Sequence, residues 1–231
     1  MKKAGLSVLL LLAGMSVMAQ SWKSSQHISG INSLQVSHGI DVYLTQGNRE
    51  SLTIEAKGFD KDEVKVDTRN GVLRLSTDRS WGFNWGRDRY VKVYLTFKEL
   101  NNIRTSGGAD LFSEGTLSFD NLVIDASGGS DVKLDLKANR LEVDISGGAD
   151  ARLRGSARLL TAESSGGADL DARQLASEIC MVSASGGSDA YVHATREIKM
   201  RASGGSDIYY YGSPRVISKN KSGGGDITRR D

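Results

Sequence analysis

Aspartates recur at one fixed place in a pentapeptide, Ser-Gly-Gly followed by Ala, Ser or Gly and then Asp, which occurs seven times. Successive aspartates are 18 to 21 residues apart. If the copies stack as strands, their carboxylates form a row spaced about 4.8 Å apart. Neighbouring charges at that spacing repel by roughly 1 kcal/mol even in water. Hydrogen-bond donors of the protein or a bound ligand must offset this repulsion. The row consists of Asp110, Asp131, Asp150, Asp169, Asp189, Asp207 and Asp226.

Three roles are open to such a row of carboxylates. Each could accept hydrogen bonds from the N–H groups of its own glycine corner, the row could bind cations, or it could contact a glycan or another ligand. We favour corner capping, because each Asp stands at the same offset from its two glycines, as a local backbone bond requires. Calcium-binding β-helix repeats carry one Asp every nine residues and a different glycine pattern.

The sequence predicts no catalytic residue, no cofactor and no dedicated metal site. The three histidines, His27, His38 and His193, are far apart and lack the spacing of metal ligands. The chain contains no nucleophile elbow and no phosphate-binding loop. We therefore expect a protein that is not an enzyme.

A second candidate contact site is an aromatic segment with glycines between its rings: Trp81, Phe83 and Trp85. Side chains two residues apart lie on one face of a strand, and exposed aromatic side chains mark contact surfaces. These rings could present a platform to a ligand such as a sugar, or they could fold back onto the sheet, which we favour. Three further aromatics, residues 209–211, are expected to pack at the end of the repeats.

The repeat period predicts the elements that carry these residues. A period near 19 residues with strand-like sequence indicates a solenoid whose stacked coils share one core. Apolar residues alternate with polar ones before each Ser and after each Asp, as in half-buried strands on both sides of a glycine corner. Crossovers between parallel strands are right-handed in nearly all proteins. We therefore predict an all-β fold, a right-handed parallel β-helix of about 19 residues per coil.

The alternation assigns inward positions to each coil. Apolar or small side chains recur three residues and one residue before the Ser of the first six copies, and one residue after each Asp. They are expected to point into the core. Five residues before the Ser, the inward set is Leu122, Leu141, Leu160, Cys180, Ile198 and Ile217. The lone Cys180 is expected to be a packed thiol, since free cysteine behaves as a small buried hydrophobe.

The chain divides into three predicted parts. Residues 1–19 resemble a signal peptide, with Lys2 and Lys3 before an apolar run and small residues ahead of Gln20. Residues 20–104 contain a degenerate repeat at residues 37–41 and an Asn-Gly hairpin signal. They predict a hairpin-rich β region that is continuous with the solenoid of residues 105–231 and covers its first coil.

The predicted leader and the charge balance limit where the protein acts and what it binds. Beyond the leader, no apolar stretch approaches the about 20 residues of a membrane span, so the mature chain is expected to have none. The chain has 30 basic and 28 acidic residues, and Lys2 and Lys3 leave with the leader. The balanced mature chain argues against nucleic-acid binding, which usually needs a basic surface.

Several segments together resemble the head GIN domain family, described as putative auto-transporter adhesins. They are Ser29-Gly30-Ile31, residues 36–47 (VSHGIDVYLTQG), the serial repeats and residues 210–214 (YYGSP). The resemblance implies an exported β-helical protein of Gram-negative bacteria, in the periplasm or at the cell surface. The family description implies adhesion but no particular ligand, and we expect a non-enzymatic adhesin-like or structural protein whose unknown surface ligand is a glycan or a protein. The alternative is a glycan-binding or carbohydrate-active protein.

Overall fold

The protein is a β-solenoid of about seven turns, spaced about 19 residues apart, which confirms the predicted fold class. The structure is a computed structural model that describes residues 21–78 and 89–231; these contain no α-helix and one short 3-10 turn, η1 (Lys61–Glu63). No helix in this part of the chain has the length and apolar character needed to cross a bilayer. The strands are β1 (Ser21–His27), β2 (Ser33–Ser37), β3 (Ile40–Gln46), β4 (Ser51–Lys57), β5 (Val64–Arg69), β6 (Val72–Thr77), β7 (Tyr90–Phe97), β8 (Asn102–Ser106), β9 (Asp110–Ser113), β10 (Leu117–Ser127), β11 (Asp131–Ser146), β12 (Asp150–Ser164), β13 (Asp169–Gly186), β14 (Asp189–Gly204), β15 (Asp207–Tyr211), β16 (Arg215–Gly223) and β17 (Asp226–Arg229).

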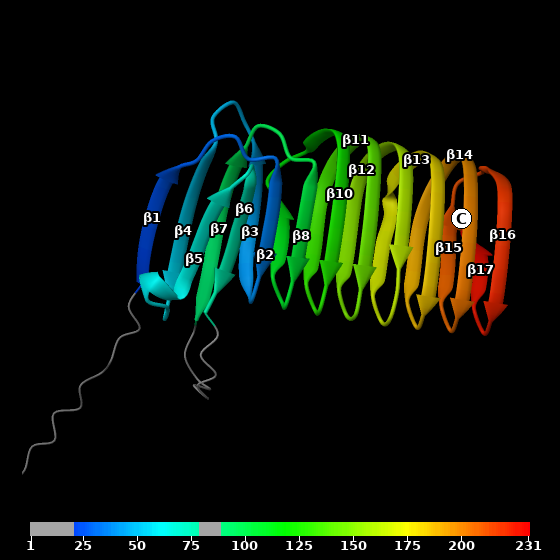
Figure 1. Cartoon of the computed structure of the whole chain (residues 1–231). Coiled ribbons are helices and arrows are strands. Elements are labelled where there is room, and N and C mark those ends of the chain that lie inside the picture. The colour runs from blue at the N-terminus through cyan, green and yellow to red at the C-terminus, as the bar shows by residue number, and fades with distance from the viewer. Residues whose placement is uncertain (1–20, 79–88) are drawn as a thin grey trace, which may run out of the picture.

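Two walls of strands enclose the core, and Figure 1 shows them as two layers that run from β1 at one end to β16 and β17 at the other. The first wall begins β1-β4-β7-β3-β9 and continues through the first halves of β11 to β14 into β15 and β17. The second wall begins β5-β6-β2-β8 and continues through β10 and the second halves of β11 to β14 into β16.

The N-terminal region joins the stack as predicted. Asp41 of the degenerate repeat pairs in register with Asp110, so β2 and β3 form a coil that lies directly on β8 and β9. The strands β6 and β7 lie beyond this coil although they follow it in sequence. The Asn-Gly signal is confirmed as a two-residue hairpin between β5 and β6, in which Asn70 and Gly71 have φ of 54° and 76°.

The inward positions are buried as predicted, with one exception. The core includes Leu141, Val143 and Cys180, and burial raises the pKa of the Cys180 thiol to about 12. The prediction for Ile217 is wrong, because this side chain is 41% exposed. Ile198 pairs with Val216 and Lys199 with Ser218, so Ile217 is the extra residue of a β-bulge.

The glycine corners combine a left-handed backbone with close stacking. Gly186 has a φ of 76°, and a Cβ atom there would lie 3.0 Å from the carbonyl oxygen of Gly166 in the coil below. Both reasons that favour glycine at a corner therefore apply at this position. The buried fourth residue of the repeat also closes the corner where it is Ser, since the Ser188 hydroxyl donates to the carbonyls of Ser185 and Ser164, each at 3.0 Å.

The return from the first wall to the second wall is itself part of the strands. In β11 and β12 the pairing runs through the return, from Leu136 with Gly155 to Ala138 with Ala157. The chain bends at Gly155, where φ is 111° and a Cβ atom would lie 2.0 Å from the carbonyl oxygen of Leu136. Only a residue without a side chain fits this bend, so the coil turns without leaving the sheet.

Candidate ligand-binding face

The aspartates of the repeats form the predicted row along the outer surface of the first wall, which we call the Asp face. Each Asp is the first residue of the strand that follows a corner, and from Asp131 to Asp226 each pairs in register with the Asp of the next coil. Asp41 extends the row by one coil at its N-terminal end, and Lys92 of β7 pairs with Asp41. The row is therefore continuous from β3 to β17.

Three of the seven carboxylates bond to the next coil, and none in the described structure accepts from its own glycine corner, so the prediction that they cap these corners is wrong. Carboxylate oxygens accept hydrogen bonds from the backbone N–H one coil later in three pairs: Asp110 with Asp131 (3.1 Å), Asp169 with Asp189 (3.3 Å) and Asp207 with Asp226 (3.0 Å). The reason is that corner N–H groups already have partners. The N–H of Gly187, for example, donates to the carbonyl of Gly166 in the preceding coil at 2.7 Å.

The environment of the row changes the acidity of several members. Burial raises the pKa of Asp189, and the neighbouring charges of Asp169 and Asp207 raise it further. Burial is also the main reason that the pKa values of Asp41 and Asp110 are raised. At the far end the effect is reversed, because the hydrogen bond from Lys221 lowers the pKa of Asp226. The repulsion expected between stacked carboxylates is therefore present in the folded protein.

The row does not converge on a metal site. In residues 21–78 and 89–231, no group of three or more His, Cys, Asp or Glu side chains is arranged to hold a metal ion. Equivalent residues of stacked coils project side by side, whereas metal ligands must point toward one centre.

A second line of side chains runs beside the Asp row, two residues further along each strand, and we call it the central column. The members of each neighbouring pair are in register from β7 to β17. The column has aromatic side chains toward both ends and charged ones in the middle, and its last member is a threonine. It consists of Tyr94, Tyr43, Phe112, Lys133, Arg152, Asp171, Tyr191, Tyr209 and Thr228.

The aromatic ends of the central column are stacked ring on ring. Tyr43 lies between Tyr94 and Phe112, with 5.2 Å between ring centroids on each side. Tyr191 and Tyr209 stack with centroids 4.8 Å apart. Such offset or parallel contacts stabilise neighbouring coils beyond the area that they bury.

Cations cover the outer faces of these rings. The Lys133 ammonium lies 5.5 Å from the centroid of Phe112, and the Arg173 guanidinium lies 4.4 Å from that of Tyr191. Arg230 lies 4.8 Å from the centroid of Tyr209. Both faces of Phe112 and of Tyr191 are thus occupied within the protein, so these two rings offer no open face to a ligand.

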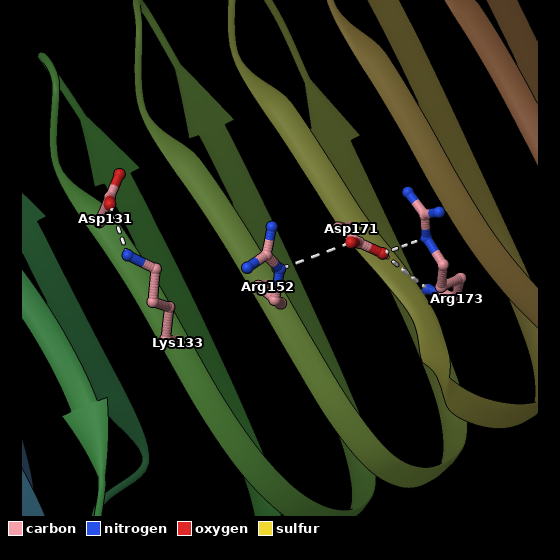
Figure 2. Close-up of polar contacts among 5 residues, drawn as sticks. All are labelled: Asp131, Lys133, Arg152, Asp171 and Arg173. Atoms are coloured by element: carbon pink, nitrogen blue, oxygen red, sulfur yellow. Dashed lines mark hydrogen bonds and ion pairs between the residues drawn. The ribbon is translucent and has the colours of Figure 1, made fainter.

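Between the two aromatic stacks, the column is polar and the surface is hollow. Figure 2 shows Lys133, Arg152 and Asp171 on successive coils. Lys133 Nζ lies 2.8 Å from Asp131 Oδ2, and Arg173 Nε lies 2.7 Å from Asp171 Oδ1. A hollow of about 310 Å³ lies over this gap and is lined by side chains of β11 to β14.

Two charged groups in the middle of the hollow have spare hydrogen-bonding capacity. The Asp150 carboxylate has no hydrogen bond or ion pair with any residue that the structure describes. Arg152, whose side chain is 56% exposed, has one ion pair, from Nε to Asp171 at 3.5 Å. Both belong to β12, where residues two apart project from the same face. A carboxylate acceptor and a guanidinium donor therefore stand next to each other on the Asp face.

The sequence pointed to the row but not to the column. Lys133, Arg152, Asp171 and Tyr191 point outward, but the sequence analysis did not identify their alignment with the aromatics of β3, β7 and β9. Comparing the residue two places after each Asp would have found the column. The aromatics at residues 209–211 do pack at the solenoid end, with Tyr209 in the stack and Tyr210 against the core. Trp81, Phe83 and Trp85 lie outside the described residues.

Comparison with known proteins supports the same picture. The sequence matches the model of a family described as "Putative auto-transporter adhesin, head GIN domain" over residues 31–214. Its fold is similar to the crystal structure of a putative adhesin from Bacteroides fragilis NCTC 9343, with a TM-score of 0.81 and 26% identity over 91% of this chain and 97% of that one. None of the curated proteins compared with it matches.

Two crystal structures from Parabacteroides distasonis ATCC 8503 share the fold at lower identity. One is a putative adhesin, with a TM-score of 0.68 and 19% identity over 92% of this chain and 98% of that one. The other is a putative lipid binding protein, with a TM-score of 0.69 and 16% identity over 91% of this chain and 97% of that one. At these identities the likeness concerns the fold alone.

Proposed function

The chain belongs to the head GIN domain family, and from that premise we propose that it is an exported, adhesin-like binding protein whose recognition surface is the Asp face. It acts in the periplasm or at the surface of a Gram-negative bacterium. Export is supported by the predicted signal peptide at residues 1–19, which precede the described residues. The family description supplies the class of function.

The observation that carries the proposal is the continuity of polar side chains along the first wall. The Asp row and the central column run in register from β3 to β17 and present charged groups from successive coils on one face. Repetition of this kind creates extended binding surfaces in solenoid proteins. The hollow over β11 to β14 is a concave part of this surface in which a ligand could be held.

The geometry of the carboxylates favours binding over catalysis. A glycoside hydrolase needs two carboxyl groups that flank one bond and are both free to act on it, one as proton donor and the other as nucleophile or base. Around the hollow, Asp131 is paired with Lys133, Asp171 with Arg173, and Asp169 with the N–H of Asp189. Asp150 alone among the lining carboxylates is free of partners in the described structure. A carbohydrate-active enzyme is therefore the weaker candidate.

Export and adhesion are tested together in the natural host. A strain that lacks the gene is complemented with the full chain, and the mature protein is sized by intact mass, which should show cleavage between Ala19 and Gln20. Adherence of the cells is measured on an immobilised glycoprotein and on the same glycoprotein after deglycosylation. Complementation should restore adherence to at least one of these surfaces. A retained leader, or adherence that does not depend on the gene, would refute the proposal.

The Asp face is tested with two matched sets of substitutions. The first replaces Lys133, Arg152 and Arg173 with Gln, and the second replaces Glu142, Asp144 and Glu163, which face outward from the second wall, with their amides. The first set should abolish the restored adherence, and the second set should leave it intact. Equal effects of the two sets would show that the Asp face is not the recognition surface.

A further inference from the structure

The hollow on the Asp face has the chemistry of a site for an uncharged, polyhydroxylated ligand. Seven charged side chains line it: four carboxylates (Asp131, Asp150, Asp169 and Asp171) and three cations (Lys133, Arg152 and Arg173). The two signs nearly cancel, so the hollow lacks the strong field of one sign that attracts a polyanion or a polycation. What it offers is a mixture of strong acceptors and strong donors.

The free groups are arranged as an acceptor beside a donor. Asp150 has four lone-pair positions and no partner in the described structure, and the terminal nitrogens of Arg152 likewise lack one. A carboxylate accepts hydrogen bonds from hydroxyl groups, and a guanidinium donates to hydroxyl or ring oxygens. Neighbouring hydroxyl groups on a sugar ring supply both kinds of partner, because each hydroxyl is a donor and an acceptor.

The fold argues against an extended peptide in the same place. Peptides that bind to sheets by their backbone add a strand to an open edge. The strands under the hollow have no open edge, since the first half of β11 lies between β9 and β12, and β12 and β13 each pair with a coil on both sides. A ligand on this face must be recognised by side chains alone.

The boundaries of the hollow limit how the ligand is held. Tyr191 lines one end of the hollow, and its two faces are covered by Tyr209 and Arg173. At the other end the lining stops at Lys133, and the next ring of the central column, Phe112, is covered by Tyr43 and Lys133. The site therefore works by polar contacts rather than by stacking a sugar on an open ring. Its volume of about 310 Å³ is at the small end for ligand pockets, about 300 to 1,000 Å³. It suits a short segment of a longer chain that continues along the solenoid.

We propose that the hollow around Asp150 and Arg152 binds the sugar units of a neutral glycan. Asp150 accepts hydrogen bonds from sugar hydroxyls, and Arg152 donates to their oxygens. The ion pair between Arg152 and Asp171 holds the guanidinium over the hollow. Lys133 lies on the coil before that of Arg152, and Arg173 lies on the coil after it (Figure 2). This inference rests on the proposed function and names the class of ligand for the same face.

The test uses the mature chain, residues 20–231, on an array that carries neutral oligosaccharides, uronic acid oligosaccharides and glucosamine oligosaccharides. The expected result is binding to at least one neutral glycan. Asp150→Asn and Arg152→Gln should each weaken that binding at least about tenfold, the effect of losing a charge-assisted hydrogen bond. Asp144→Asn on the second wall is the control and should bind normally. Melting temperatures should be unchanged in all three variants. The side chains of Asp150 and Asp144 have no partner in the described structure, and Arg152 has only the 3.5 Å ion pair with Asp171.

Each other outcome would overturn the proposal. Preference for the uronic acid probe, weakened by Arg152→Gln alone, would make the hollow an anion site. Preference for the glucosamine probe, weakened by Asp150→Asn alone, would make it a cation site. Absence of neutral glycan binding would remove the proposed ligand class, as would neutral binding that survives both substitutions. In those cases adherence to the deglycosylated surface could still uphold the proposed function.

Discussion

Asp110 Oδ1 accepts a hydrogen bond from the backbone N–H of Asp131, the equivalent residue one coil later, at 3.1 Å. The same relation joins Asp169 to Asp189 and Asp207 to Asp226. Each of these carboxylates lies on the outside of one coil and holds the start of the next strand. The Asp row is therefore a link between coils, and its role in the fold differs from one member to the next.

This link can be measured at Asp110. Asp110→Ala removes the acceptor and should lower the free energy of unfolding by about 1 kcal/mol, the usual net value of one hydrogen bond. Asp110→Asn keeps an oxygen at the same place and should cost less. The matched control is Asp150→Ala, because the Asp150 carboxylate has no partner in the described structure. Urea unfolding of the three variants checks this, and equal losses at the two alanine positions would contradict it.

The crowding of carboxylates predicts an unusual pH dependence at Asp189. Burial and the charges of Asp169 and Asp207 raise its pKa above the ordinary value of 3.8. At pH values between 3.8, the pKa in the unfolded chain, and the raised pKa in the folded protein, the folded protein holds a proton that the unfolded chain has released. The contribution of Asp189 to stability therefore falls as the pH rises through this window and stays low at neutral pH.

Asp189→Asn should remove this contribution. The variant should gain stability over the parent at pH 7, and the gain should shrink as the pH falls through the raised pKa and below 3.8, where Asp189 becomes protonated in both states. Urea unfolding of both proteins at several pH values measures the difference. A gain that stays constant or grows on acidification would show that the carboxylate is not destabilised by its neighbours.

The sequence was informative wherever a property depends on the repeat alone. Alternation gave the buried positions Val143 and Cys180, and equal spacing gave the row of aspartates. The hydrogen-bond partners of that row were not predictable in the same way. These partners depend on the backbone carbonyl of Gly166 and its equivalents, which accept the hydrogen bonds of the corner N–H groups and leave none for the aspartates. The bulge that exposes Ile217 was likewise not predictable, because it is a shift of register within the pairing of β16 with β14 that the repeat spacing does not contain.

The inward and outward register is open to a direct test at two adjacent residues. Val143 is 1% exposed, so Val143→Asp would bury an unpaired charge and should cost several kcal/mol. Asp144 is exposed and stands between Asp125 and Glu163 of the neighbouring coils. Asp144→Lys replaces like charges with opposite ones across the strands, which should stabilise by about 0.2 to 1 kcal/mol. Thermal unfolding followed by circular dichroism separates the two, and equal sensitivity at these positions would refute the register.

The two demands on a corner glycine can be separated with three alanine substitutions. Gly186 has a φ of 76° and no room for a Cβ atom, which would lie 3.0 Å from the Gly166 carbonyl oxygen. Gly108 has a similar φ of 75° but open space around its Cβ position. Gly187 needs no positive φ, and its nearest neighbour would be 3.6 Å away. Gly186 therefore needs glycine both for its backbone conformation and for close stacking, Gly108 needs it for the backbone conformation alone, and Gly187 needs it for neither.

The expected order of destabilisation follows from these demands. Gly108→Ala should cost about 1 to 2 kcal/mol, the penalty of a left-handed conformation for a residue with a Cβ atom. Gly186→Ala should cost more, because the two coils must also move apart. Gly187→Ala should be neutral or slightly stabilising, since alanine lowers the entropy of the unfolded chain. Urea unfolding of the three variants measures the order. If Gly186→Ala and Gly108→Ala cost the same, close stacking of the corners contributes nothing and the glycines serve the backbone conformation alone.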